Sequence, residues 1–260
     1  IDTKINYGFI QIFENPHVQI TADSTYSCSV PFNVEFFDIT PDAISWDWNF
    51  GNGINSLLST AYYTYSNYGS YDFELIVKNS KGCSDTALFI DFIEVEEIII
   101  DVIVSEIKGC TPFNVNFFDS TNSIRPIIDW SWSFGDGNSA INQSPENQYI
   151  TADSFDVSLS IINDYGCVAS RVFTDIIKVY EIPQVDFQAS HLISCAGQDI
   201  NFSDLTFSAS SLTNWFWDFG DGSISSLQNP IFQYQLTGNY DLSLIAESNN
   251  CRDTLKILNY

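Results

Sequence analysis

Ser-Trp-Asp-Trp-Asn-Phe-Gly-Asn-Gly, at residues 45–53, is the first of three copies of one stretch in this chain. The second copy is Asp-Trp-Ser-Trp-Ser-Phe-Gly-Asp-Gly at 129–137, and the third is Asn-Trp-Phe-Trp-Asp-Phe-Gly-Asp-Gly at 214–222. All 6 tryptophans lie in these copies. The copies follow one another at intervals of about 85 residues, which is the size of a small β domain. The sequence therefore predicts a tandem array.

Strand geometry gives the stretch a structural role. Side chains two residues apart in a strand point to the same face, so both tryptophans and the phenylalanine of a copy, such as Trp46, Trp48 and Phe50, are expected to share one side and form a wall of the core. The glycines that follow tolerate positive φ and allow a sharp turn, and Asp136 and Asp221 are expected to bond backbone amides of that turn. We expect core and turn positions at Trp48, Phe50, Gly51, Gly53, Trp132, Phe134, Gly135, Gly137, Trp217, Phe219, Gly220 and Gly222.

The rest of each repeat also alternates apolar and polar residues, as half-buried strands do, and no helix is expected. Residues 1–15 resemble the last strand of a repeat, because Ile1-Asp2-Thr3 matches Ser84-Asp85-Thr86; the array is then expected to continue upstream. Three repeats follow, at 16–98, 99–183 and 184–260. Their joints lack a Gly/Ser-rich spacer, so we expect neighbouring domains at restricted angles, as in a stiff rod.

Composition excludes several function classes. The chain has 33 acidic and 9 basic residues, for a net charge of −24, which disfavours nucleic acid and anionic membrane surfaces as partners. No apolar run reaches the ~18 residues of a membrane-spanning helix.

The cysteines also follow the repeat. Each full repeat has one before its second expected strand and one in the turn before its last strand. Pairing within repeats leaves no thiol over. Joining each turn cysteine to the first cysteine of the next repeat would instead leave Cys28 and Cys251 unpaired. We expect Cys28–Cys83, Cys110–Cys167 and Cys195–Cys251, with reduced, buried cysteines as the alternative. Disulfides indicate an oxidising, extracytoplasmic setting, and two cysteines without a nearby histidine are too few for a metal site.

Repeat three resembles the polycystic kidney disease (PKD) repeat. The resemblance rests on Trp-Asp-Phe-Gly-Asp-Gly at 217–222, Asn-Phe-Ser-Asp at 201–204, Gln-Asn-Pro at 228–230 and the strand pattern at 237–244. Repeat two is nearly as similar, and repeat one departs from the pattern with Asn52 in place of the aspartate. The resemblance covers essentially the whole chain and implies tandem immunoglobulin-like β-sandwich domains in an all-β fold.

What the resemblance implies for function is an extracellular spacer, adhesive stalk or accessory module. Long arrays with two cysteines per repeat and this composition resemble the large surface adhesins of gliding bacteria that use type IX secretion. A non-catalytic structural or adhesive segment of a bacterial cell-surface filament is therefore expected, with neighbouring repeats and surface glycans or proteins as partners. The alternative is a spacer or glycan-binding module of a secreted polysaccharide- or protein-degrading enzyme.

No catalytic constellation, cofactor site or metal site is expected. His17 and His191 are the 2 histidines, and neither lies in a nucleophile motif. Calcium is a weak alternative, because the oxygen-bearing residues Asp47 and Asn49 do not recur in the other repeats. Glycan binding would need exposed aromatic rings, for which Phe37, Phe118 and Phe216 are the candidates, since they fall on the face opposite the core.

Overall fold

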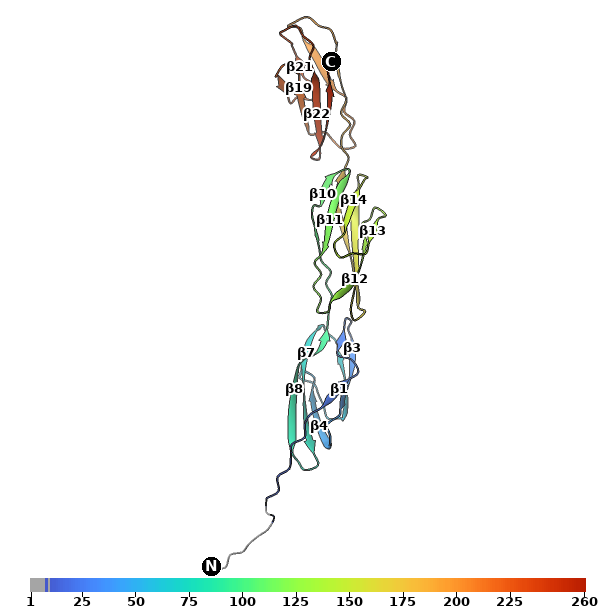
Figure 1. Ribbon diagram of the computed structural model, residues 1–260, viewed down its shortest axis with the longest axis vertical. Coiled ribbons are helices and arrows are strands. Elements are labelled where there is room, and N and C mark those ends of the chain that lie inside the picture. The colour runs from blue at the N-terminus through green and yellow to red at the C-terminus, as the bar shows by residue number, and fades with distance from the viewer. Residues whose placement is uncertain (1–7, 9) are drawn as a thin grey trace, which may run out of the picture. The chain divides into compact units, whose positions relative to one another are not determined.

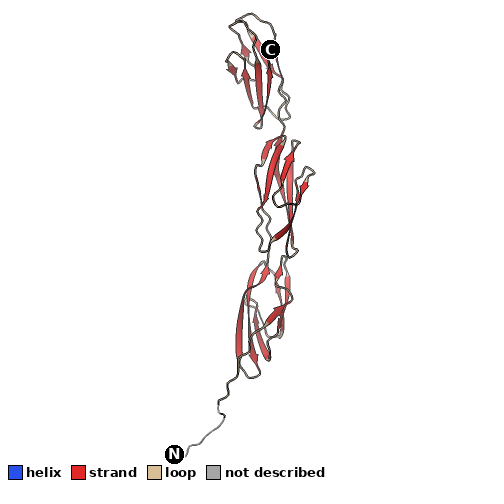
Figure 2. Ribbon diagram, in the orientation of Figure 1, coloured by secondary structure: helices blue, strands red, loops and turns tan. Residues whose placement is uncertain are grey.

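The computed structural model describes residue 8 and residues 10–260. Throughout this part of the chain every regular element is a strand (Figure 2), so no helix that could cross a membrane is found in it. The chain divides into two compact units. The first holds Ile1–Ile99 with two short segments of the second repeat, Asn122–Pro126 and Asn163–Cys167. The second holds Ile100–Thr121, Ile127–Ile162 and Val168–Tyr260.

The first repeat is a sandwich of a three-stranded and a five-stranded sheet, labelled in part in Figure 1. The smaller sheet has the order β1-β3-β6 and the larger the order β2-β8-β7-β4-β5. Within the larger sheet, β2 runs parallel to the end of β8, and the other pairs are antiparallel. The strands are β1 (Ile20–Ala22), β2 (Tyr26–Ser27), β3 (Phe32–Asp38), β4 (Ala43–Asn49), β5 (Asn55–Ser56), β6 (Thr60–Tyr65), β7 (Gly69–Asn79) and β8 (Ser84–Val95).

The second repeat has the same two sheets, in the orders β14-β11-β9 and β10-β16-β15-β12-β13. Its β10 again runs parallel to the end of the last strand, β16. The strands are β9 (Val102–Val104), β10 (Lys108–Cys110), β11 (Phe113–Asp119), β12 (Ile127–Ser133), β13 (Ser139–Ala140), β14 (Glu146–Tyr149), β15 (Ser154–Asn163) and β16 (Val168–Tyr180).

The third repeat keeps the plan but lacks one strand. Its sheets have the orders β17-β18-β21 and β20-β19-β22-β23, with no counterpart of β2 or β10. The last strand ends at Ile257 and pairs only with β22, not with the segment around Cys195. The strands are β17 (Phe187–Ala189), β18 (Ile200–Asp204), β19 (Asn214–Asp218), β20 (Ile224–Ser225), β21 (Ile231–Phe232), β22 (Leu242–Ser248) and β23 (Cys251–Ile257).

The tryptophan stretch lies at the centre of each sandwich. The second tryptophan and the phenylalanine of every copy are at most 1% exposed, at Trp48, Phe50, Trp132, Phe134, Trp217 and Phe219. Each buried indole donates to a backbone carbonyl ten residues later, from Trp48 to Leu58 (2.8 Å), Trp132 to Asn142 (3.1 Å) and Trp217 to Leu227 (3.0 Å). The indole nitrogen is thereby satisfied, which removes the cost of burying it.

The turn that follows this strand is built as the sequence predicts. The phenylalanine amide donates across the turn, as from Phe134 to the Asn138 carbonyl at 3.2 Å. Asp136 and Asp221 each accept a backbone amide two residues on, at 2.9 Å. Both aspartates therefore form Asx-turns, in which the side chain accepts the backbone amide two residues on.

The prediction that residues 1–15 form the last strand of an upstream repeat stays a prediction. Residues 1–7 and 9 lie outside the described residues, and Ile10–Phe13 lie in no strand. The segment contacts the turn of Cys83, because the Cys83 thiol donates to the Phe13 carbonyl at 3.9 Å and the Asn79 side chain donates to the Glu14 carbonyl at 3.2 Å.

Candidate functional site

The disulfides join successive repeats. Cys28 is bonded to Cys167, with the two Cα atoms 6.0 Å apart, and Cys110 is bonded to Cys251, at 5.6 Å. The predicted pairs Cys28–Cys83, Cys110–Cys167 and Cys195–Cys251 are therefore wrong. In both observed bonds the first cysteine of one repeat meets the turn cysteine of the next, and we call each such bond a staple.

Strand register explains the correction. Cys28 follows β2, which pairs with Glu94 and Val95 at the end of β8, whereas Cys83 precedes Ser84 at the start of β8. β8 has 12 residues, and at about 3.3 Å per residue its ends lie roughly 36 Å apart. Disulfides need Cα atoms within about 7 Å. The two cysteines of a repeat are thus at opposite ends of its longest strand.

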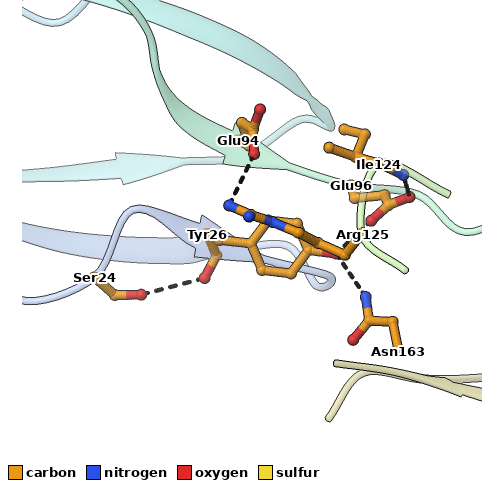
Figure 3. A network of polar contacts seen from close by, with 7 residues as sticks. All are labelled: Ser24, Tyr26, Glu94, Glu96, Ile124, Arg125 and Asn163. Carbon is orange, nitrogen blue, oxygen red and sulfur yellow. Dashed lines mark hydrogen bonds and ion pairs between the residues drawn. The ribbon is translucent and has the colours of Figure 1, made fainter. Parts of the chain in front are cut away.

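A buried polar cluster, whose residues Figure 3 shows, lies next to the first staple, since its Asn163 accepts the Cys167 amide. Tyr26 and Glu96 are 4% and 5% exposed, and the Tyr26 hydroxyl donates to the Glu96 carboxylate. The other carboxylate oxygen accepts the Ile124 amide at 2.5 Å. Asn163, which is fully buried, donates from its side-chain nitrogen to the Tyr26 hydroxyl at 2.9 Å. Residues of the first repeat therefore bind both segments that the second repeat contributes to this unit.

Arg125 covers this cluster. Its guanidinium forms an ion pair with Glu94 at 3.3 Å and lies over two aromatic rings, with its carbon 5.1 Å from the Tyr26 centroid and 4.8 Å from that of Tyr165. The two rings also contact each other, with centroids 4.6 Å apart. Cation–π contacts of this kind are strongest where water is excluded.

The electrostatics keep Tyr26 neutral. Burial raises the pKa of the Tyr26 hydroxyl well above its usual value, and the neighbouring Glu96 carboxylate raises that pKa further. A neutral phenol is the form that can donate to the carboxylate, so the hydrogen bond and the shift support each other. The cluster has the character of a structural junction, because Tyr26, Glu96 and Asn163 are buried and hydrogen-bonded through the Tyr26 hydroxyl.

The second staple has a simpler environment. β10 aligns Cys110 with Tyr180, and the Thr111 amide continues the pairing to the Tyr180 carbonyl at 3.0 Å. Cys251 is 1% exposed, beside the buried Ser248, whose hydroxyl donates to the Ser211 carbonyl at 3.0 Å. Lys108 stands at the position of Tyr26 and Tyr180 at that of Glu96, so the staple recurs while the polar cluster does not.

Sequence reasoning missed the cluster residues Tyr26, Glu96, Arg125 and Asn163. One signal was available, since Asn-x-x-Gly-Cys occurs at both 79–83 and 163–167. In each copy the asparagine side-chain oxygen accepts two turn amides, so this residue shapes the turn that presents the cysteine. Of the outward aromatic candidates, Phe118 and Phe216 are exposed and Phe37 is half-buried. Among the described residues no group of three or more His, Cys, Asp or Glu side chains is placed to hold a metal ion.

The family comparison agrees with the repeat structure. The family model described as PKD domain matches residues 14–92, 99–179 and 180–257. Among solved structures, the N-terminal eight Ig domains of Down Syndrome Cell Adhesion Molecule isoform 1.30.30 are 10% identical, with 95% of this chain and 36% of that chain covered and a TM-score of 0.44. Extracellular domains 3-5 of Drosophila OTK are 9% identical, with 95% of both chains covered and a TM-score of 0.40. The fibronectin(III)-like modules of Clostridium thermocellum CbhA are 13% identical, with 62% and 93% covered and a TM-score of 0.33.

Proposed function

The chain belongs to the PKD domain family, and on that premise we propose that it is a non-catalytic, load-bearing segment of a long surface filament, such as an adhesin stalk of a gliding bacterium. PKD domains and disulfides together indicate an extracellular protein. The observation that carries the proposal is the pair of staples. Each one adds a covalent connection between successive repeats beside the backbone.

A second covalent connection is useful where a chain is pulled. Force applied along the backbone would first extend the joint between two repeats, but a staple transfers that force to a sulfur–sulfur bond anchored in both. The buried cluster around Tyr26 and Glu96 supports the same role, because its hydrogen bonds cross from the first repeat to Ile124 and Asn163 of the second.

The charge also suits a surface stalk. A net charge of −24 with 9 basic residues makes copies of this segment repel one another, which opposes lateral aggregation. The neighbouring repeats of the same polypeptide are then the principal partners.

The size of the native parent tests this proposal. Antibodies raised against residues 10–260 should detect, on a reducing and denaturing gel of the source cells, a band well above about 100 kDa, because three domains of this size account for only 29.3 kDa. Surface proteolysis of intact cells should remove that band. A parent near or below about 100 kDa, or a band protected from the protease, would count against a surface filament.

The second candidate function is a glycan-binding accessory module of a secreted enzyme. The observation in its favour is the exposure of Phe118 and Phe216, since sugar rings stack on exposed aromatic faces. A glycan array and pull-down with chitin and cellulose test it directly. Binding that is lost in F118A or F216A would favour this function, whereas no binding by the wild-type chain would eliminate it.

A further inference from the structure

Two cysteines take no part in the staples, and they are of opposite kinds. Cys83 is a turn cysteine, equivalent to Cys167 and Cys251, and Cys195 is a first cysteine, equivalent to Cys28 and Cys110. Every other cysteine of either kind is bonded to one of the opposite kind. The two free thiols are therefore the two halves of one further bond of the observed type.

The turn of Cys83 already has the bonded geometry. In it the Asn79 side-chain oxygen accepts the amides of Lys81 and Cys83, both at 3.0 Å. In the turn of the bonded Cys167, the Asn163 oxygen accepts the amides of Tyr165 and Cys167, also both at 3.0 Å. The backbone bonds match as well, from Asn79 to Cys83 at 3.0 Å and from Asn163 to Cys167 at 3.1 Å. The turn thus presents Cys83 with the same hydrogen bonds as the bonded Cys167, although Cys83 has no disulfide partner.

The residues around Cys195 are exposed, whereas the equivalent residues of the first repeat are covered by neighbouring segments. Ile193 occupies the position of Tyr26, and it is 91% exposed where Tyr26 is 4% exposed. Cys195 itself is exposed and borders a cavity of about 270 Å³ that is lined in part by Leu192 and Leu236. In the first repeat the end of β8 and the turn of the second repeat cover the equivalent residue.

We propose that Cys195 and Cys83 each form a staple with another PKD domain. Cys195 bonds to the turn cysteine of a domain that docks on the uncovered end of the third repeat, and Cys83 bonds to a first cysteine at the equivalent end of another domain. The partner of Cys195 is a domain that offers a cysteine in a turn such as Asn-x-x-Gly-Cys. The partner of Cys83 is a domain that offers a cysteine at the end of a short strand equivalent to β2 or β10. This proposal concerns assembly and does not depend on the adhesive role.

The bond forms by thiol–disulfide exchange with a disulfide oxidant such as glutathione disulfide. One cysteine thiolate attacks the oxidant and releases one glutathione thiolate. The second cysteine thiolate attacks the resulting mixed disulfide and releases the other. The two cysteines together lose two protons and two electrons, and the oxidant is reduced to two molecules of glutathione.

A fusion of two copies of this chain can supply the missing partner in the observed register. Asn259 and Asp91 occupy equivalent positions, since both have φ near 50° and both donate their amide to an aspartate side chain, of Asp241 just before β22 and of Asp72 within β7. Tyr260 is therefore equivalent to Phe92. Joining Tyr260 directly to Ile10 of a second copy lets Ile10–Phe13 continue the last strand as Ile93–Glu96 do. The separation from Cys195 to Cys83 of the second copy is then about 139 residues by the residue numbers, and the Cys28–Cys167 staple has the separation 139.

The fusion is refolded in a glutathione redox buffer and digested without reduction for peptide mapping by mass spectrometry. We expect a Cys195–Cys83 peptide between the copies and two free thiols by titration. Four free thiols, or Cys195 bonded within its own copy, would overturn the proposal. The matched control is the fusion with Cys195→Ser in the first copy, which should show three free thiols and no linked peptide.

An intermolecular experiment keeps the proposal testable if the fusion does not fold. Equal amounts of C83S and C195S single chains are mixed in the same buffer and their disulfide dimers are separated by mass tags. Specific docking predicts a dominant heterodimer linked between Cys195 and Cys83. A random mixture, in which the heterodimer is about half of all dimers, or an absence of heterodimer, would overturn it.

Discussion

At the scale of single residues, one tyrosine hydroxyl separates the first repeat from the other two. Tyr149 and Tyr234 lie fifteen residues after the phenylalanine of the motif and donate to its carbonyl, at 3.2 Å to Phe134 and 3.0 Å to Phe219. Tyr65 stands at the same spacing from Phe50, yet its buried hydroxyl has no hydrogen-bond partner. Burying a hydroxyl costs desolvation free energy, and without a hydrogen-bond partner nothing offsets that cost.

Y65F is therefore expected to be neutral or to stabilise the protein by up to about 1 kcal/mol, because it removes only the unpartnered group. Y149F serves as the matched control and should cost about 0.5–1.5 kcal/mol, since it loses a hydrogen bond and leaves the Phe134 carbonyl without that donor. Urea unfolding followed by tryptophan fluorescence measures both. A larger loss for Y65F than for Y149F would contradict the assignment.

A second residue-scale contrast lies within the glycine turn. Gly135 and Gly137 both have positive φ, but a Cβ on Gly135 would stand 2.5 Å from the Asp156 carbonyl oxygen, whereas one on Gly137 would meet nothing within 4 Å. Gly51 and Gly220 repeat the close approach, at 2.0 and 2.2 Å from the carbonyls of Asp72 and Asp241. The first glycine is thus required both by backbone conformation and by space.

G137A should accordingly cost about 1–2 kcal/mol, the usual penalty of a positive φ for a residue with a Cβ. G135A carries the same penalty and a backbone clash, so a loss of more than about 3 kcal/mol is expected. Thermal and urea unfolding of the two variants side by side give the difference. Equal losses would mean that the backbone moves aside and that proximity to β15 is unimportant.

At the scale of elements, the polar cluster at the first staple makes a specific prediction. Y26F removes the hydroxyl that satisfies both Glu96 and Asn163, so two buried groups each lose a partner and the cost should be about 1–3 kcal/mol. Y62F is the control, because the Tyr62 hydroxyl also donates to a glutamate, Glu35, but at an exposed site. Y62F should leave the free energy of unfolding essentially unchanged, because solvent screens this pair.

Hydrogen exchange localises the effect. The amides of Ile124 and Cys167, which are held by Glu96 and Asn163, should lose protection in Y26F and keep it in Y62F. Unchanged protection at both amides in Y26F would show that the cluster does not hold these segments.

The elements also show which information a sequence carries locally. The faces of Trp48, Phe50 and their equivalents follow from the two-residue period of a strand, and the aspartate turns follow from local hydrogen bonding. Disulfide pairing depends instead on which end of β8 the short strand β2 joins, and β2 has only 2 residues. Equal numbers of cysteines per repeat favoured pairing within repeats, although a 12-residue strand separates those cysteines. The same non-local pairing brings Tyr26 to Glu96, so the cluster was missed as well.

At the scale of the whole molecule, the two staples overlap along the chain. Cys28–Cys167 and Cys110–Cys251 each enclose about 140 residues, and both loops contain residues 110–167. The shortest covalent path between the chain ends crosses both sulfur bonds and runs through this shared segment. Counted from residue to residue, that path has about 93 steps, whereas the whole backbone has about 259. At about 3.6 Å per step, the oxidised chain can extend to roughly 330 Å and the reduced chain to roughly 930 Å.

Overlap makes the two staples redundant as limits on extension, which can be measured by pulling single molecules from their ends. C28S/C167S leaves a path of about 118 residue steps, because Cys110–Cys251 still bypasses most of the chain, and the full extension should grow by only about 90 Å. C110S/C251S should behave in the same way, whereas removal of all four cysteines should add about 600 Å. Pairing within repeats would instead leave one closed loop in C28S/C167S and lengthen that variant by about 400 Å, so this variant alone distinguishes the two connectivities.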